Sequence, residues 1–161
     1  ASSDYASDEE FELAVSVAGS LGVRAIRDAR TVSVVVGERT PDFAKRKVFA
    51  VSQLSTLTRS RLLDDLAVIE HAESALNVRD VARVVSERVG GISVAFLLCG
   101  SRTTPTQLRA ASASFPVDVE VVAIVCDPEI VPGLRRVPGL SVLTIGYLKD
   151  LQKSLSRSAA A

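Results

Sequence analysis

The sequence predicts an α/β fold with a doubly wound, mainly parallel sheet that has one antiparallel edge strand and helices on both faces. Apolar segments at 92–98, 119–125 and 140–145 each end in a polar turn, and helical patterns alternate with them along the chain. These segments show little alternation of apolar and polar residues, which is typical of strands that are covered on both faces. Helices that connect parallel strands would supply that cover.

The first part of the chain predicts a helix and two strands. Residues 7–10 have the spacing of a capping box, so a helix should begin there, and its apolar stripe runs to about residue 28. A β-branched run at 31–36 predicts a buried strand. A charged connector at 38–47 follows, and 48–52 is expected to return as a short, peripheral antiparallel strand.

Four more helices are expected further along. Leucines at helical spacing predict a helix over 59–71, and Asn77 is a good cap for the next helix. Residues 104–107 form a second capping box, with proline at the first helical position. The last helix begins near residue 148, and the tail from Ser156 is expected to fray because serine and alanine have little to bury.

Length and composition predict a single domain over residues 1–161, which we expect to be a piece of a longer protein because no initiator methionine is present. The longest uncharged run lies between Arg88 and Arg102 and has 13 residues, whereas a membrane-spanning helix needs about 20. The chain begins without a basic and apolar leader. We therefore expect no membrane contact by these residues.

Charge and composition exclude several classes of function. The chain has 19 basic and 19 acidic residues and only seven aromatic residues, which argues against a nucleic-acid partner. Two cysteines and one histidine cannot form a disulfide scaffold or a cysteine- or histidine-rich metal centre. Neither of the common glycine-rich phosphate motifs occurs, and the G-x-S-x-G motif of serine hydrolases is absent. We expect no cofactor and no enzymatic activity.

The only histidine, His71, falls at the C-terminal end of a predicted helix. A histidine at that position contacts terminal carbonyl groups more often than it takes part in catalysis. The acidic side chains near the start of the chain are interpreted in a similar way, as favourable charge at the N-terminus of the first helix; they are Asp4, Asp8, Glu9 and Glu10.

Polar and thiol side chains are expected together at the carboxyl edge of the sheet. Cys99 and Cys126 each end an apolar strand. Burial as small hydrophobic residues is favoured over a reactive thiolate, because no C-x-x-C motif or adjacent cation is present. Asp127, with the hydroxyl groups of Ser101, Thr103 and Thr104, offers the ligand chemistry that suits Mg²⁺. The favoured alternative is that Asp127 starts a turn before a proline and that Thr104 caps a helix.

Three stretches carry a resemblance to a known family. They are Phe11-Glu12-Leu13-Ala14-Val15, Arg61-Leu62-Leu63-Asp64-Asp65-Leu66-Ala67 and Gly146-Tyr147-Leu148-Lys149-Asp150-Leu151. With the order of elements, they resemble the C-terminal, von Willebrand factor A-like part of an actinobacterial member of bacterial domain-of-unknown-function family fifty-eight. The resemblance implies a cytoplasmic domain, a parent protein anchored in the membrane by upstream helices, and a MoxR-type AAA ATPase as partner.

The chain departs from that family pattern in its metal site. The D-x-S-x-S motif is absent, and Cys99-Gly100-Ser101 stands where a carboxylate is expected, so the resemblance implies a degenerate metal-ion-dependent adhesion site. The family's first, central strand would lie before residue 1. Without it, the strand edges at 31–37 and 92–99 must pair with each other or recruit another chain, which makes a homo-oligomer through an exposed edge an expectation.

The sequence thus predicts a non-enzymatic, protein-binding domain that uses the carboxyl edge of its sheet. Its candidate residues are Cys99, Ser101, Arg102, Thr103, Cys126 and Asp127. The alternative is an α/β domain, enzymatic or not, that binds a small molecule or nucleotide through the backbone amides at Thr104 to Gln107.

Overall fold

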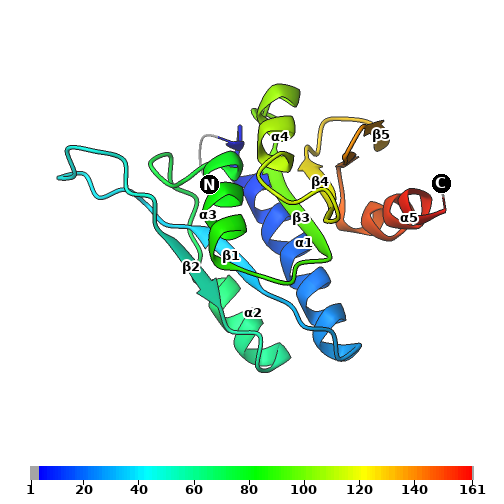
Figure 1. Ribbon diagram of the computed structural model, residues 1–161, viewed down its shortest axis with the longest axis horizontal. Helices are drawn as coiled ribbons and strands as arrows, with labels where there is room; N and C mark the ends of the chain where they lie inside the picture. Colours follow the sequence, from blue (N-terminus) through cyan, green and yellow to red (C-terminus); the bar gives the residue numbers. More distant parts are fainter. Residues whose placement is uncertain (1–3, 161) are drawn as a thin grey trace.

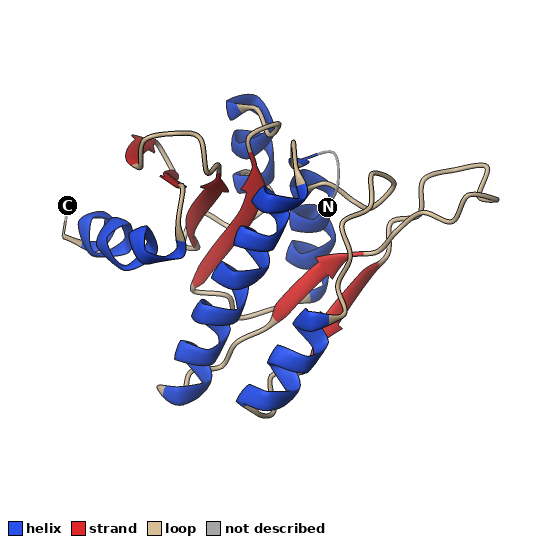
Figure 2. Cartoon of the chain, turned by 180° about the vertical axis from the view of Figure 1, so that it is seen from behind, coloured by secondary structure: helices blue, strands red, loops and turns tan. Residues whose placement is uncertain are grey.

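The computed structural model describes residues 4–160 and confirms the α/β class. Its main sheet has four strands in the order β3-β4-β6-β5, and a second sheet is formed by β1 and β2 alone (Figures 1 and 2). The elements are α1 (Asp8–Arg27), β1 (Val34–Gly37), β2 (Val51–Leu54), α2 (Arg59–Ala67), α3 (Val78–Arg88), β3 (Val94–Gly100), α4 (Pro105–Ser112), β4 (Glu120–Cys126), β5 (Gly133–Val137), β6 (Leu140–Ile145) and α5 (Leu148–Ala159).

The three parallel strands of the main sheet end at one edge. Gly100 at the end of β3 lies opposite Cys126 of β4, and Cys126 lies opposite Ile145 of β6. The loops that follow these strands therefore meet at that edge. We call residues 101–104, 127–132 and 146–147 the carboxyl rim.

Helices cover both faces of the main sheet, as the doubly wound prediction requires. On one face α3 and α4 pack against β3 and β4, with Ala82 and Leu108 among the buried side chains. On the other face α1 and α5 pack against β4 and β6, with Val17 and Leu151 in the core. Burial on both sides explains why these strands are so uniformly apolar.

The antiparallel edge strand of the main sheet is β5, and the sequence analysis missed it. Pro132 and Gly133 are residue types that usually interrupt a strand, but Pro132 directly precedes β5, where no backbone amide is needed for pairing, and Gly133 is the first residue of this edge strand. The turn from β5 to β6 is Pro138-Gly139, and Gly139 has φ 75°, which a glycine adopts without strain. β2 does pair antiparallel with β1, but this hairpin forms a sheet of its own.

The edges of β1 and β3 do not close on each other. Among the described strands β1 pairs only with β2, and β3 pairs only with β4. Val15, Ala18 and Ile26 of α1 pack against the hairpin and α2, while other residues of α1 pack on the main sheet. A shared helix therefore connects the two sheets, and one edge of β3 pairs with none of the described strands.

Two helix ends differ from the prediction. α2 ends at Ala67, so His71 lies in the loop beyond it. α5 continues through Ser156 to Ala159, because the Ser156 hydroxyl donates to the Gln152 carbonyl and Arg136 of β5 donates to the Ser158 carbonyl. None of the helices within residues 4–160 combines the length and the apolar character required to cross a membrane.

Candidate functional site

Two buried carboxylates attach the segment before α1 to the carboxyl rim. Asp4 is 2% exposed and Glu10 is 5% exposed. Carboxylates are rarely buried to this degree unless hydrogen bonds compensate for the loss of hydration. Both side chains reach groups that lie more than 70 residues away in the sequence.

Glu10 clamps the loop after β3 to the start of α1. Its Oε2 accepts hydrogen bonds from the backbone amide of Ala6 at 2.8 Å and from that of Ser101 at 3.0 Å. The Ser101 hydroxyl donates to Oε1 at 2.6 Å. Only half of the predicted capping box forms: the Ser7 hydroxyl accepts from the Glu10 amide, whereas the Glu10 carboxylate accepts from the Ala6 amide instead of that of Ser7 and also holds the rim.

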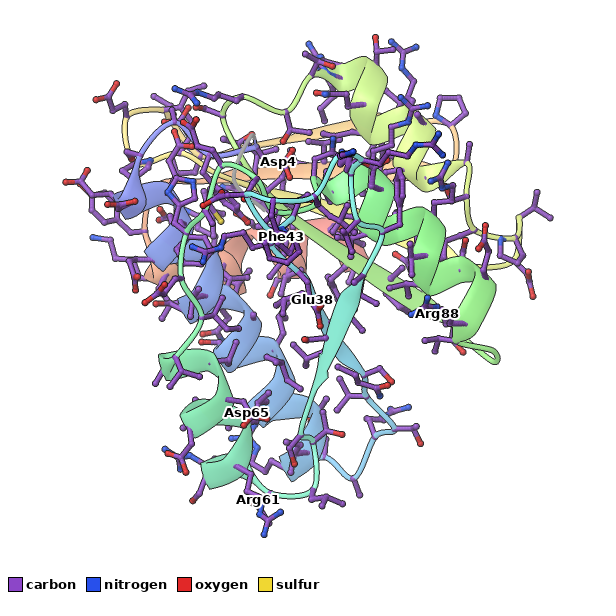
Figure 3. All side chains as sticks on the ribbon, turned by 90° about the vertical axis from the view of Figure 1, so that its left-hand side faces the viewer. Asp4, Glu38, Phe43, Arg61, Asp65 and Arg88 are labelled. Carbon is purple, nitrogen blue, oxygen red and sulfur yellow. The ribbon has the colours of Figure 1, made fainter. Side chains whose placement is uncertain are left out.

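Asp4, labelled in Figure 3, joins the same loop to the start of α3. Its Oδ2 accepts from the backbone amide of Val78 at 2.7 Å, and its Oδ1 accepts from the Thr103 hydroxyl at 3.1 Å. Its own carbonyl accepts from the Arg102 amide at 3.1 Å. The prediction that Asp4 supports the N-terminus of the first helix is therefore wrong, because it binds the first residue of α3.

Burial raises the pKa of the Asp4 carboxyl above its ordinary value, although the hydrogen bonds from Val78 and Thr103 act in the opposite direction. Burial also raises the pKa of the Tyr5 hydroxyl well above its ordinary value. That hydroxyl donates to the Leu98 carbonyl in β3. Residues 4 and 5 are thus held against the end of β3 by both polar contacts and burial.

His71 contacts α1 rather than the carbonyl groups at the end of α2. Its Nδ1 lies 2.7 Å from Oδ1 of Asp8. Its ring stacks on Phe11, with centroids 5.3 Å apart, and meets the edge of Tyr5 at 5.9 Å. The predicted contact with the carbonyls of a helix end is wrong because α2 stops four residues earlier. His71 instead packs the loop after α2 onto the first helix.

The predicted rim residues differ in how far the structure exposes them to solvent. Ser101 and Arg102 are exposed, and Arg102 lies 3.9 Å from the Glu73 carboxylate. Thr103 is buried, because its hydroxyl binds Asp4. Asp127 is half-buried. It follows Cys126, which pairs with Gly100, so Asp127 lies in the rim loop after β4, next to the loop after β3.

The hydroxyl and carboxylate groups considered for Mg²⁺ have other partners. Asp127 accepts from the Glu129 amide within its own turn, as expected for an aspartate that starts a turn. Thr104 and Gln107 form the predicted reciprocal capping box of α4. Among the described residues, no group of three or more histidine, cysteine, aspartate or glutamate side chains is arranged to hold a metal ion.

Cys99 and Cys126 are completely buried, which confirms the interpretation of each as a small hydrophobic residue. Burial raises the pKa of the Cys126 thiol to about 12 and that of the Cys99 thiol further. Both thiols are therefore protonated at neutral pH, and neither contributes to the exposed surface of the rim.

Sequence reasoning missed an apolar surface on the rim. We call Ile130, Val131, Tyr147 and Leu148 the apolar rim surface; all four side chains are exposed, Val131 by 84% and Tyr147 by 62%. The turn at 128–130 packs closely on Gly146, which brings the two loops together. The signal in the sequence was the presence of large apolar residues directly after strand ends, where polar turn residues are usual.

The chain was also compared with known proteins, and no family model, curated protein or solved structure matches it.

A substitution at Gly100 tests how closely residues 4–10 pack against the rim. A Cβ at this position would lie 2.7 Å from the Asp4 carbonyl oxygen and 2.4 Å from Oε2 of Glu10. We expect Gly100→Ala to lower the free energy of unfolding by about 3 kcal/mol, since the backbone must shift. Chemical denaturation measures the change. Gly90→Ala is the control, because nothing lies within 4 Å of its Cβ; equal stability of the two variants would contradict this packing.

Asp4 should give a defined pH dependence of stability. The pKa of the Asp4 carboxyl is higher in the folded state than its unfolded value of 3.8, so Asp4 stabilises the fold most at pH values below 3.8. This contribution is lost as the pH rises through the pKa of the folded state. The stability of the wild type relative to Asp4→Asn should therefore fall as the pH increases from below 4 to 7. Denaturant titrations at each pH measure the difference, and Asp118→Asn corrects for the loss of an exposed carboxylate. A relative gain in stability with pH would contradict the assignment.

Proposed function

We propose that this protein is a non-enzymatic interaction domain that binds a protein partner through its carboxyl rim. The observation that carries the proposal is the apolar rim surface, which is at the same edge of the sheet as the exposed polar residues Ser101 and Arg102. Exposed aromatic and aliphatic side chains bordered by an arginine are typical of the energetic centre of protein interfaces. The loops that carry them are supported by a buried sheet edge, which limits the entropy lost on binding.

The resemblance described above suggests the partner and the setting. By that analogy the partner is a MoxR-type AAA ATPase, and the domain works in the cytoplasm while upstream helices anchor the parent protein in the membrane. The degenerate metal site would then leave recognition to side-chain contacts. The chemistry of the rim suits this, because apolar contacts and a single arginine need no bridging ion.

Ligand binding at the start of α4 receives less support. The Thr104 hydroxyl accepts from the Gln107 amide, and the Gln107 side chain accepts from the Thr104 amide. Two of the amides that would hold a phosphate or nucleotide are therefore already satisfied within the helix.

The rim proposal predicts a selective loss of affinity. Val131→Asp places a charge in the apolar rim surface, and Arg102→Glu reverses the charge beside it. Each should weaken binding to a purified MoxR-type ATPase at least about tenfold, as expected for residues at an interface centre. Biolayer interferometry measures the affinity, and thermal melting verifies folding.

The matched control is Val117→Asp, which changes an exposed valine in the loop before β4, at the opposite end of that strand. It should bind as the wild type does. Unchanged affinity in both rim variants, with binding by the wild type, would exclude the rim as the interface.

We further propose self-association through β3. Its outer edge has no hydrogen-bonded neighbour among the described strands, and Val94 and Phe96 on it are exposed. An open strand edge with apolar side chains pairs readily with another strand, and charged side chains prevent such pairing.

Sedimentation equilibrium tests this proposal. The wild type should form dimers as its concentration increases, and Phe96→Lys should remain monomeric. Leu134→Lys on the other edge strand, β5, is the matched control and should dimerise as the wild type does. A wild type that stays monomeric, or dimers that persist in Phe96→Lys, would contradict association through β3.

A further inference from the structure

The loop between β1 and β2 extends away from the rest of the molecule (Figure 1). It comprises residues 38–50 and is described throughout. Its base is held by hydrogen bonds from the Glu38 amide to the Ala50 carbonyl and from the Thr40 amide to the Ser74 carbonyl. Figure 3 views the molecule from this side and labels Glu38 at the base and Phe43 in the extended part.

The loop is locally basic although the chain as a whole is neutral. It contains four cationic residues and two acidic residues, for a net charge of +2. Lys47 pairs with Asp80 of α3. Lys45 and Arg46 are exposed, and within the described part of the chain no carboxylate forms an ion pair with either. Their charges are therefore available to an external anion.

The two phenylalanines of the loop differ in their surroundings. The Arg83 guanidinium lies 4.8 Å from the Phe49 ring centroid and Nζ of Lys47 lies 5.8 Å from it, and Phe49 is 44% exposed. Phe43 is 88% exposed. Phe43 is thus the more exposed of the two rings, and it lies two positions from a pair of available cations.

We propose that loop 38–50 binds the surface of an anionic lipid bilayer, with the Phe43 ring inserted between headgroups and Lys45 and Arg46 beside lipid phosphates or carboxylates. Apolar rings next to basic residues bind such surfaces by two additive effects, burial of the ring and attraction to the negative surface. The protruding position lets Phe43 reach the bilayer before the bulk of the domain meets it.

The same features fit other anionic partners less well. Binding of a nucleic-acid strand uses successive aromatic platforms and a basic groove. Here no cation among the residues that the structure describes lies over the Phe43 ring, the Phe49 ring contacts Arg83, and the loop protrudes from the molecule (Figure 1). The absence of a spanning helix, on which the expectation of no membrane contact was based, does not affect this proposal, because contact with a membrane surface needs no span.

Vesicle sedimentation tests the proposal. The domain should bind vesicles that contain about 30% phosphatidylserine more strongly than vesicles of phosphatidylcholine alone, and added salt should weaken binding. Phe43→Ser should reduce the partition coefficient about tenfold, from the loss of a half-buried ring. Lys45→Gln combined with Arg46→Gln should reduce it about 25-fold, at about fivefold for each cation.

Matched controls change similar residues elsewhere. Val117→Ser removes an exposed apolar side chain, and Arg59→Gln combined with Arg61→Gln removes two exposed cations from α2. Both should bind vesicles as the wild type does. Equal losses in the loop and control variants would overturn the proposal, because they would reflect net charge or overall hydrophobicity.

Insertion has a separate readout, since the chain contains no tryptophan. The fluorescence of Phe43→Trp should shift to shorter wavelength with anionic vesicles and be quenched by brominated lipid chains, whereas that of Val117→Trp should not change. The proposal is overturned if the wild type does not bind anionic vesicles, or if Phe43→Trp stays accessible to water on them. Binding to a single-stranded oligonucleotide without binding to vesicles would assign the loop to nucleic acid instead.

Discussion

The burial of Asp4 and Glu10 is the constraint on which the arrangement of this domain depends. Removing two carboxylates from water is costly, so each must be compensated by hydrogen bonds of suitable geometry. Asp4 accepts two and Glu10 accepts three, from the starts of α1 and α3 and from the loop after β3. These bonds position α1, which in turn packs on both the main sheet and the β1–β2 hairpin.

This arrangement separates a supported framework from exposed surfaces. The core strands are buried on both faces, and the carboxylates hold the rim loop after β3 in place. The apolar rim surface and loop 38–50 carry large side chains that the core does not use. The rim and membrane proposals rest on this excess of exposed apolar side chains, which is unfavourable in a free monomer and favourable once covered. They concern different residues and are independent of each other.

Much of the fold could be predicted from the sequence, because the signals are local. Local signals each specify an element within about ten residues: the N-cap at Ser7, the capping box at Thr104, and the apolar runs of β4 and β6. β5 could not be predicted in the same way, because its own composition does not indicate a strand and it becomes one by pairing with β6. The extent of α5 was underestimated because Arg136, on a different element, binds its last turn.

The sequence alone determined the α/β class, the order of most elements and the place of the carboxyl rim, since helical and strand periodicity are properties of neighbouring residues. It identified Ser101, Arg102 and Thr103 as rim residues, but it could not show that Thr103 binds Asp4 or that Ser101 binds Glu10. Only the tertiary structure decided those pairings and the exposure of Phe43 and Tyr147. Each depends on contacts between residues far apart in the chain, and burial is a property of the packed molecule rather than of any segment.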